Sequence, residues 1–97
     1  MPIRMKVYHR GRETLVAACD EELLGKTFRE RGLKIEVSAF YAGDPVTEEQ
    51  LLAHLRFATI GNFVGKETIA IVARGGFVAE DGVLWIDGVP HAQFCVM

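Results

Sequence analysis

The apolar residues of this 97-residue chain follow two different periods, and this contrast limits the fold more than any other feature. Near the N-terminus, Ile3, Met5 and Val7 alternate with polar residues, which is the two-residue period of a half-buried strand. Between residues 48 and 58 the apolar residues lie three or four positions apart, which is the period of a helix. The combination predicts an α+β fold, and the length predicts one domain over residues 1–97.

The first third of the chain is predicted to form an N-terminal β-hairpin, a short helical turn and a third strand. Gly11 supplies the hairpin turn, and residues 14–18 form the returning strand. Asp20 can cap the helical turn that follows, and Gly25 can end it in a left-handed conformation. Residues 33–38 alternate again between apolar and polar, which predicts the third strand.

Two helices are predicted in the middle of the chain. Thr47 can cap the first helix, and Gln50 can close a capping box with it. This helix is expected to run from about Glu48 to Ala58. Asn62 is expected to open the second helix as its cap, and a pair of glycines ends it. The apolar segment Ile69–Ala73 inside that helix could instead form a buried strand, because periodicity does not separate the two.

The chain ends in a predicted C-terminal β-hairpin. Asp87–Gly88 is a strong two-residue turn signal between two apolar segments. Pro90 lacks an N–H, so we expect the last strand to begin after it or to lie at the edge of the sheet. Phe94 and Val96 share the face that should be buried. The other face, expected to be at least partly exposed, carries His91, Gln93 and Cys95.

Positive charge is concentrated near the N-terminus, although the net charge of the chain is only −2. Residues 1–34 carry eight Lys or Arg against five acidic residues, a net of +3, whereas residues 35–97 have a net of −5. Cations around an aromatic ring can hold phosphates and stack a base, so the first hairpin could bind single-stranded RNA. A solvated strand face is the alternative, which the acidic pI of about 5.9 favours. The residues concerned are Arg4, Lys6, Tyr8, Arg10 and Arg12.

No other chemistry has a clear pattern in the chain. Cys19 and Cys95 belong to no CxxC pair, and we expect two free thiols. The histidines and cysteines lack the spacing of metal ligands, and the glycines match no phosphate-binding loop. We therefore expect no metal, no cofactor and no catalytic residue, and we favour a protein that is not an enzyme.

Apolar runs reach only five residues, and the N-terminus lacks a long apolar segment, so a cytoplasmic protein without membrane contact is expected.

Four segments occur in a specific order and together resemble one protein family. They are CDEELLGKTF, AFYAGDPV, GNFVGK and GVPHAQF. This combination resembles the archaeal family known as domain of unknown function 424, over residues 6–96. The resemblance implies a small, single-domain, cytosolic archaeal protein, and it brings no known catalytic or binding residues. It directs attention to polar residues inside the segments, which we take as candidate ligand-binding or partner-binding residues: His91, Gln93, Asn62 and Asp20.

The sequence leaves three functions open. The first is a non-enzymatic binding module that contacts RNA or a translation-linked protein through the basic N-terminal hairpin. The second is a small enzyme or ligand-binding protein whose polar site gathers His91, Gln93 and Asn62. The third is a protein-interaction or dimer-forming adaptor that uses a sheet edge or Trp85. The oligomeric state stays open with them.

Overall fold

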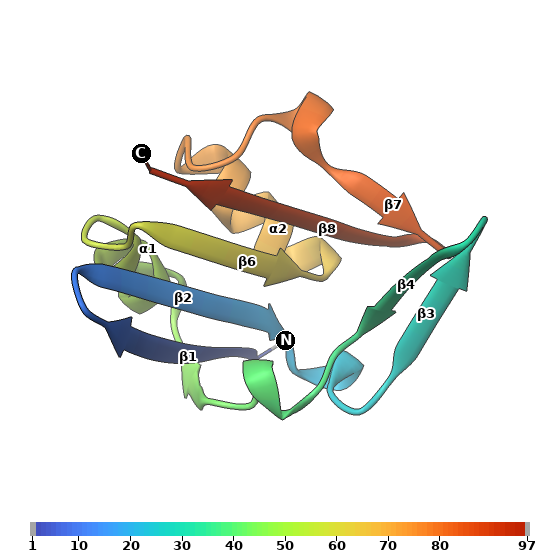
Figure 1. Ribbon diagram of the computed structural model, residues 1–97, viewed down its shortest axis with the longest axis horizontal. Helices are drawn as coiled ribbons and strands as arrows, with labels where there is room; N and C mark the ends of the chain where they lie inside the picture. The colour runs from blue at the N-terminus through green and yellow to red at the C-terminus, as the bar shows by residue number, and fades with distance from the viewer. Residues whose placement is uncertain (1, 97) are drawn as a thin grey trace.

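A six-stranded mixed sheet with two helices on one face forms the body of the protein (Figure 1). The computed structural model describes residues 2–96. Its strands are β1 (Ile3–Arg10), β2 (Glu13–Asp20), β3 (Thr27–Glu30), β4 (Leu33–Glu36), β5 (Asp44–Val46), β6 (Ile60–Val64), β7 (Leu84–Ile86) and β8 (Val89–Cys95). Its helices are α1 (Glu48–Leu55) and α2 (Lys66–Arg74), with short 3-10 turns η1 (Glu21–Leu23), η2 (Ala39–Tyr41) and η3 (Glu80–Gly82).

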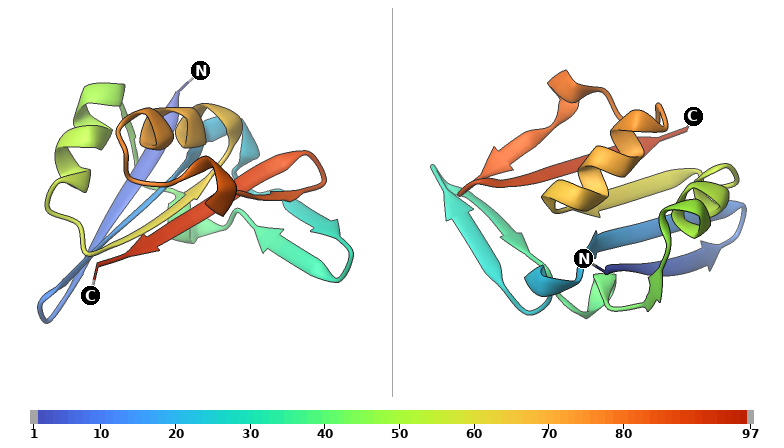
Figure 2. Two further views of the ribbon diagram at one scale, coloured as in Figure 1. Left: turned by 90° about the horizontal axis from the view of Figure 1, so that it is seen from above. Right: turned by 180° about the vertical axis from the view of Figure 1, so that it is seen from behind.

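The strand order of the large sheet is β5-β1-β2-β6-β8-β7. Strand β2 pairs parallel with β6, and the other neighbours are antiparallel. Strands β3 and β4 form a separate hairpin. Seen from above, both helices lie on one face of the large sheet, and this hairpin projects from the other side at one end (Figure 2). We call that other side the helix-free face. The predicted α+β class is confirmed.

Two apolar clusters fix the helices and the small hairpin to opposite faces of the sheet. Under the helices, Val16 and Phe63 are fully buried with Leu51 of α1. On the helix-free face, Cys19 and Val64 are buried against Ile35 and its neighbours from the β3–β4 hairpin and η2. The central strand β2 is therefore buried on both faces over most of its length, as expected for a strand with a parallel neighbour.

Several predicted elements are confirmed. Both terminal hairpins form, and the second one turns at Asp87 and Gly88 with positive φ angles of 50° and 77°. Thr47 and Gln50 make the predicted capping box of α1. That helix ends at Leu55 and is shorter than predicted.

The prediction that Asn62 caps the second helix is wrong. Residues 60–64 form β6, the central strand between β2 and β8, and Asn62 lies in its middle. Helix α2 starts after Gly65, which adopts a φ of 113°. The five-residue apolar pattern of β6 is too short to separate a strand from the start of a helix, and only its pairing with β2 decides. Strand β3 was also missed, since its sequence TFRE has a single large apolar residue.

The prediction that the last strand begins after Pro90 or lies at an edge is also wrong. Strand β8 begins at Val89, and it lies between β6 and β7. The chain tolerates Pro90 here because the β6–β8 ladder already ends at the Val64–His91 pair, and the Pro90 carbonyl accepts the N–H of Gly65 at 3.0 Å.

The expected burial of the last strand holds only in part. Phe94 is half-buried, and its ring lies 5.9 Å from that of Phe63 and 6.1 Å from that of Phe77. Val96 was expected to be buried, but it lies beyond the end of β8 and is 60% exposed. The alternating pattern of a strand has no meaning past its last paired residue.

Candidate functional site

A cluster of polar side chains lies on the helix-free face, centred on Asn62 of β6. The Asn62 side-chain oxygen Oδ1 accepts a short hydrogen bond from the hydroxyl of Tyr41 in η2. It also contacts Nε2 of His91 in β8 at 3.1 Å. A carbonyl oxygen can only accept, so Nε2 of His91 carries the proton in this contact. One amide oxygen thus joins η2, β6 and β8.

Burial keeps both partners of Asn62 uncharged near neutral pH. Desolvation lowers the pKa of His91, because a half-buried imidazolium loses hydration. Desolvation raises the pKa of Tyr41 to about 12, with a smaller contribution from the nearby Cys19 thiol. Both groups therefore act as neutral hydrogen-bond donors toward Asn62.

Gln93 completes this cluster, which we call the amide site and define as Tyr41, Asn62, His91 and Gln93. Gln93 lies directly opposite Asn62 across the β6–β8 pair, and its side chain is exposed. Within residues 2–96, neither the Gln93 side chain nor the NH₂ group of Asn62 has a hydrogen-bond partner. The structure thus brings together three of the predicted residues. Sequence patterns missed Tyr41, although it stands in the quoted segment AFYAGDPV.

Asp20 lies elsewhere and has a structural role. Its carboxylate accepts the backbone N–H groups of Glu67 and Thr68 at 3.2 and 2.9 Å, and the Thr68 hydroxyl at 2.7 Å. Asp20 therefore caps α2 from another strand, because Gly65 at the N-cap position has no side chain to do so. The expected side-chain cap of the turn η1 is absent, which corrects that prediction.

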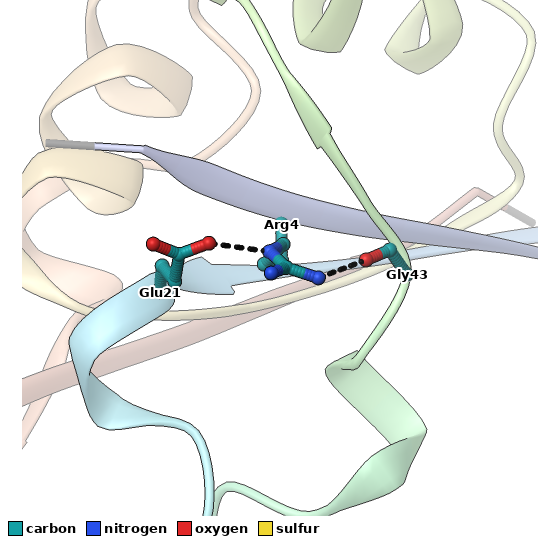
Figure 3. Close-up of polar contacts among 3 residues, drawn as sticks. All are labelled: Arg4, Glu21 and Gly43. Carbon is teal, nitrogen blue, oxygen red and sulfur yellow. Dashed lines mark hydrogen bonds and ion pairs between the residues drawn. The ribbon is translucent and has the colours of Figure 1, made fainter.

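One cation of β1, Arg4, is less available for binding nucleic acid than the sequence suggested. Figure 3 shows the Arg4 guanidinium between Glu21 and Gly43. Its Nε lies 2.7 Å from the Glu21 carboxylate, and a terminal nitrogen donates to the Gly43 carbonyl at 3.0 Å. Arg4 is thus half-buried and holds β1, η1 and the segment before β5 together. We exclude it from any nucleic-acid interface.

Tyr8 is also more enclosed than expected. Its ring stacks on Phe40 with a centroid distance of 5.1 Å, and its hydroxyl donates to the Phe40 carbonyl at 2.8 Å. The Lys6 ammonium lies 5.4 Å from the Tyr8 ring centroid. Base stacking needs an exposed ring face, and Phe40 already covers one face of the Tyr8 ring. Lys6, Arg10 and Arg12 are exposed, as a phosphate-binding role requires.

The two cysteines are free, as predicted. Cys19 is level with His91 along the sheet, whereas Cys95 is level with Leu15 near the other end. Burial, followed by the Asp20 charge, raises the pKa of Cys19 to about 12, so its thiol is not activated. Cys95 is exposed. Among the residues that the structure describes, no group of three or more His, Cys, Asp or Glu side chains could hold a metal ion.

The edge strand β7 carries two exposed apolar side chains. Leu84 is 43% and Trp85 54% exposed. A cavity of about 390 Å³ separates Trp85 from α2 and is lined mainly by apolar residues such as Ile69 and Ala73.

Two of three comparisons with known proteins gave a match. The family model described as "Protein of unknown function (DUF424)" matches residues 8–97, so the chain belongs to this family. A search of curated proteins gave no significant match. The fold is similar to the crystal structure of an uncharacterized conserved protein from Methanopyrus kandleri, which is 24% identical. That match covers 100% of this chain and 93% of the other, with a TM-score of 0.85, and it supports the fold alone.

No helix within residues 2–96 is both long enough and apolar enough to cross a membrane.

Proposed function

We propose that the protein is a non-enzymatic module that binds single-stranded RNA on the helix-free face. The observation that carries the proposal is the position of three exposed cations, Lys6, Arg10 and Arg12, at one margin of this face. The amide site lies on the same face, two to three strands away. Phosphates need accessible cations, and unstacked bases need hydrogen-bonding groups beside them.

The charge distribution supports this face over the helical one. Residues 3–36, which form the two hairpins and the turn η1 that joins them, carry eight basic and six acidic side chains, with Arg4 paired to Glu21. Helices α1 and α2 with η3 carry five acidic and two basic side chains. Such a separation favours approach of a polyanion from the helix-free side, even though the whole chain is acidic.

The dimensions also suit a single strand. Three strand spacings separate β1 from β8, which is about 14 Å. The turn η2 lies between the two, because Phe40 stacks on Tyr8 of β1 and Tyr41 reaches Asn62 of β6. A strand whose phosphates follow Lys6 and Arg10 along β1 would therefore pass its bases over η2 toward the amide site.

Charge removal on the two faces tests the proposal. The variant Lys6→Gln/Arg10→Gln removes two phosphate contacts without setting a like charge opposite Glu13, the cross-strand partner of Arg10. The matched variant Arg56→Gln/Lys66→Gln removes two exposed cations from the helical side. Affinity for a short RNA of mixed sequence is measured by fluorescence anisotropy over a salt series.

We expect the first variant to lower the slope of log K against log salt by about 0.7 for each lost contact, and the matched variant to keep the wild-type slope. Equal losses in the two variants would contradict the assignment of the face. Absence of binding by the wild type at about 50 mM salt would contradict RNA binding itself.

A second candidate function is self-association through the edge strand β7, which the exposed Leu84 and Trp85 favour. Two copies could pair their β7 edges and cover both tryptophans. Sedimentation of the wild type should then show a concentration-dependent dimer that Trp85→Ser abolishes. A monomer at all concentrations would exclude it.

A further inference from the structure

We propose that Asn62 and Gln93 form a subsite that recognises the edge of one unstacked nucleobase. The proposal rests on the RNA binding proposed above. It adds the class of group that is recognised and the direction of one hydrogen bond, from the Asn62 NH₂ group to an acceptor on the base.

The Asn62 side chain is held in one orientation by its two partners. Its oxygen accepts from the Tyr41 hydroxyl and from His91 Nε2, so both of its lone pairs are used. Rotation of the amide by half a turn would require His91 to adopt its other tautomer, so that Nε2 accepts, and would leave the Tyr41 hydroxyl proton without this acceptor. Tyr41 and His91 act as positioning residues for this amide.

The NH₂ group of Asn62 is the part that remains for a ligand. Among residues 2–96, no buried side-chain nitrogen or oxygen lacks a hydrogen-bond partner, and the Asn62 NH₂ group has none. This NH₂ group must therefore reach the surface, although Asn62 as a whole is only half-exposed. An amide NH₂ group at the surface exchanges only water when it bonds a ligand.

Gln93 supplies a second amide beside the first. Directly opposite residues of an antiparallel pair have Cβ atoms about 5 Å apart, so the two side chains can contact one planar ligand. Gln93 has both a free donor and a free acceptor, whereas Asn62 offers only a donor. Planar amides pair with base edges through such donors and acceptors, and single-stranded RNA leaves these edges open.

Nuclear magnetic resonance of the side-chain amides tests the subsite without an RNA polymer. The chain has three side-chain amides, Asn62, Gln93 and Gln50, and Gln50 is engaged in the cap of α1. We expect nucleoside 5′-monophosphates to shift the NH₂ signals of Asn62 and Gln93, whereas Gln50 serves as the internal control. Ribose 5-phosphate, which lacks a base, should leave all three in place. Unshifted Asn62 and Gln93 signals with every nucleotide would overturn the subsite, whether or not RNA binds.

Two variants test the same subsite on RNA. Asn62→Asp replaces the NH₂ donor by an acceptor but keeps both contacts of Oδ1, and Gln93→Ala removes an exposed amide that has no partner. The measured quantity is the ratio of affinities for a base-bearing strand and an abasic strand, which cancels the effect of added charge on phosphate binding. We expect each variant to lower this ratio about tenfold. An unchanged ratio in both variants, with RNA still bound, would overturn the subsite and leave RNA binding in place.

Discussion

The carboxylate of Asp20 occupies the space where a side chain on residue 65 would lie. A Cβ atom placed on Gly65 would be 2.6 Å from both carboxylate oxygens of Asp20. Gly65 also adopts a φ of 113°, which side-chain-bearing residues rarely adopt. The chain thus passes from β6 into α2 at a glycine, and a neighbouring strand provides the cap that the glycine lacks.

Gly65→Ala should therefore destabilise the protein by about 2–4 kcal/mol, because it strains the backbone and displaces the Asp20 cap. Urea denaturation measures this. Gly11→Ala is the matched control, since Gly11 has a φ of 59° and open space around it, and it should cost about 1 kcal/mol or less. Equal losses in the two variants would show that the Asp20 contact contributes nothing.

The pH dependence of stability should report the lowered pKa of His91. The unfolded chain binds the proton more readily than the folded one, so His91 favours folding fully above about pH 6.5. This contribution is lost as the pH falls from there through the folded-state pKa. His91→Gln should remove that part of the pH dependence in urea titrations. Ring resonances of His91 that titrate at or above the value of a free imidazole would contradict the buried, neutral ring.

The two cysteines should react at very different rates. Cys95 is exposed, whereas Cys19 is buried and has a pKa of about 12. A thiol reagent at neutral pH should modify one cysteine in the folded protein and the second only after unfolding, as mass spectrometry can show. Rapid modification of both thiols in the folded state would contradict the packing of β2 against the β3–β4 hairpin.

Phe94 and Val96 should differ in their contribution to stability, although the alternating pattern of the sequence assigns both to the same strand face. Phe94→Ala should cost about 2–4 kcal/mol, because its ring packs against Phe63 and Phe77. Val96→Ala should change the free energy of unfolding by no more than about 0.5 kcal/mol, since Val96 is 60% exposed. Similar losses in the two variants would mean that β8 extends further than described.

Local patterns predicted what local interactions determine. Both terminal hairpins and the Thr47–Gln50 capping box form as the sequence indicated, because turn residues and caps act within a few positions. Asn62 was assigned to a helix because the partner that makes it a strand, β2, lies more than forty positions earlier. Pairing between strands so far apart in the sequence leaves no signal within a short segment.

The sequence predicted several residues of the candidate site but not the contacts between them. Asn62, His91 and Gln93 were selected from short segments, but their contact depends on the pairing of β6 with β8. Tyr41 reaches the site because it lies in the turn η2, and a three-residue turn has no periodic pattern of apolar residues that could predict it. Arg4 was predicted to be an open cation, and only the tertiary fold places Glu21 beside it.

Binding of RNA to the helix-free face is the central claim, and a chemical-shift map of the backbone amides tests it most directly. A short single-stranded RNA is titrated into ¹⁵N-labelled protein at about 50 mM salt, where phosphate contacts are strong. We expect the shifted amides to lie in β1, η2, β6 and β8, with those of α1 and α2 nearly unchanged. Shifts confined to the two helices, or no shifts at all, would contradict the claim.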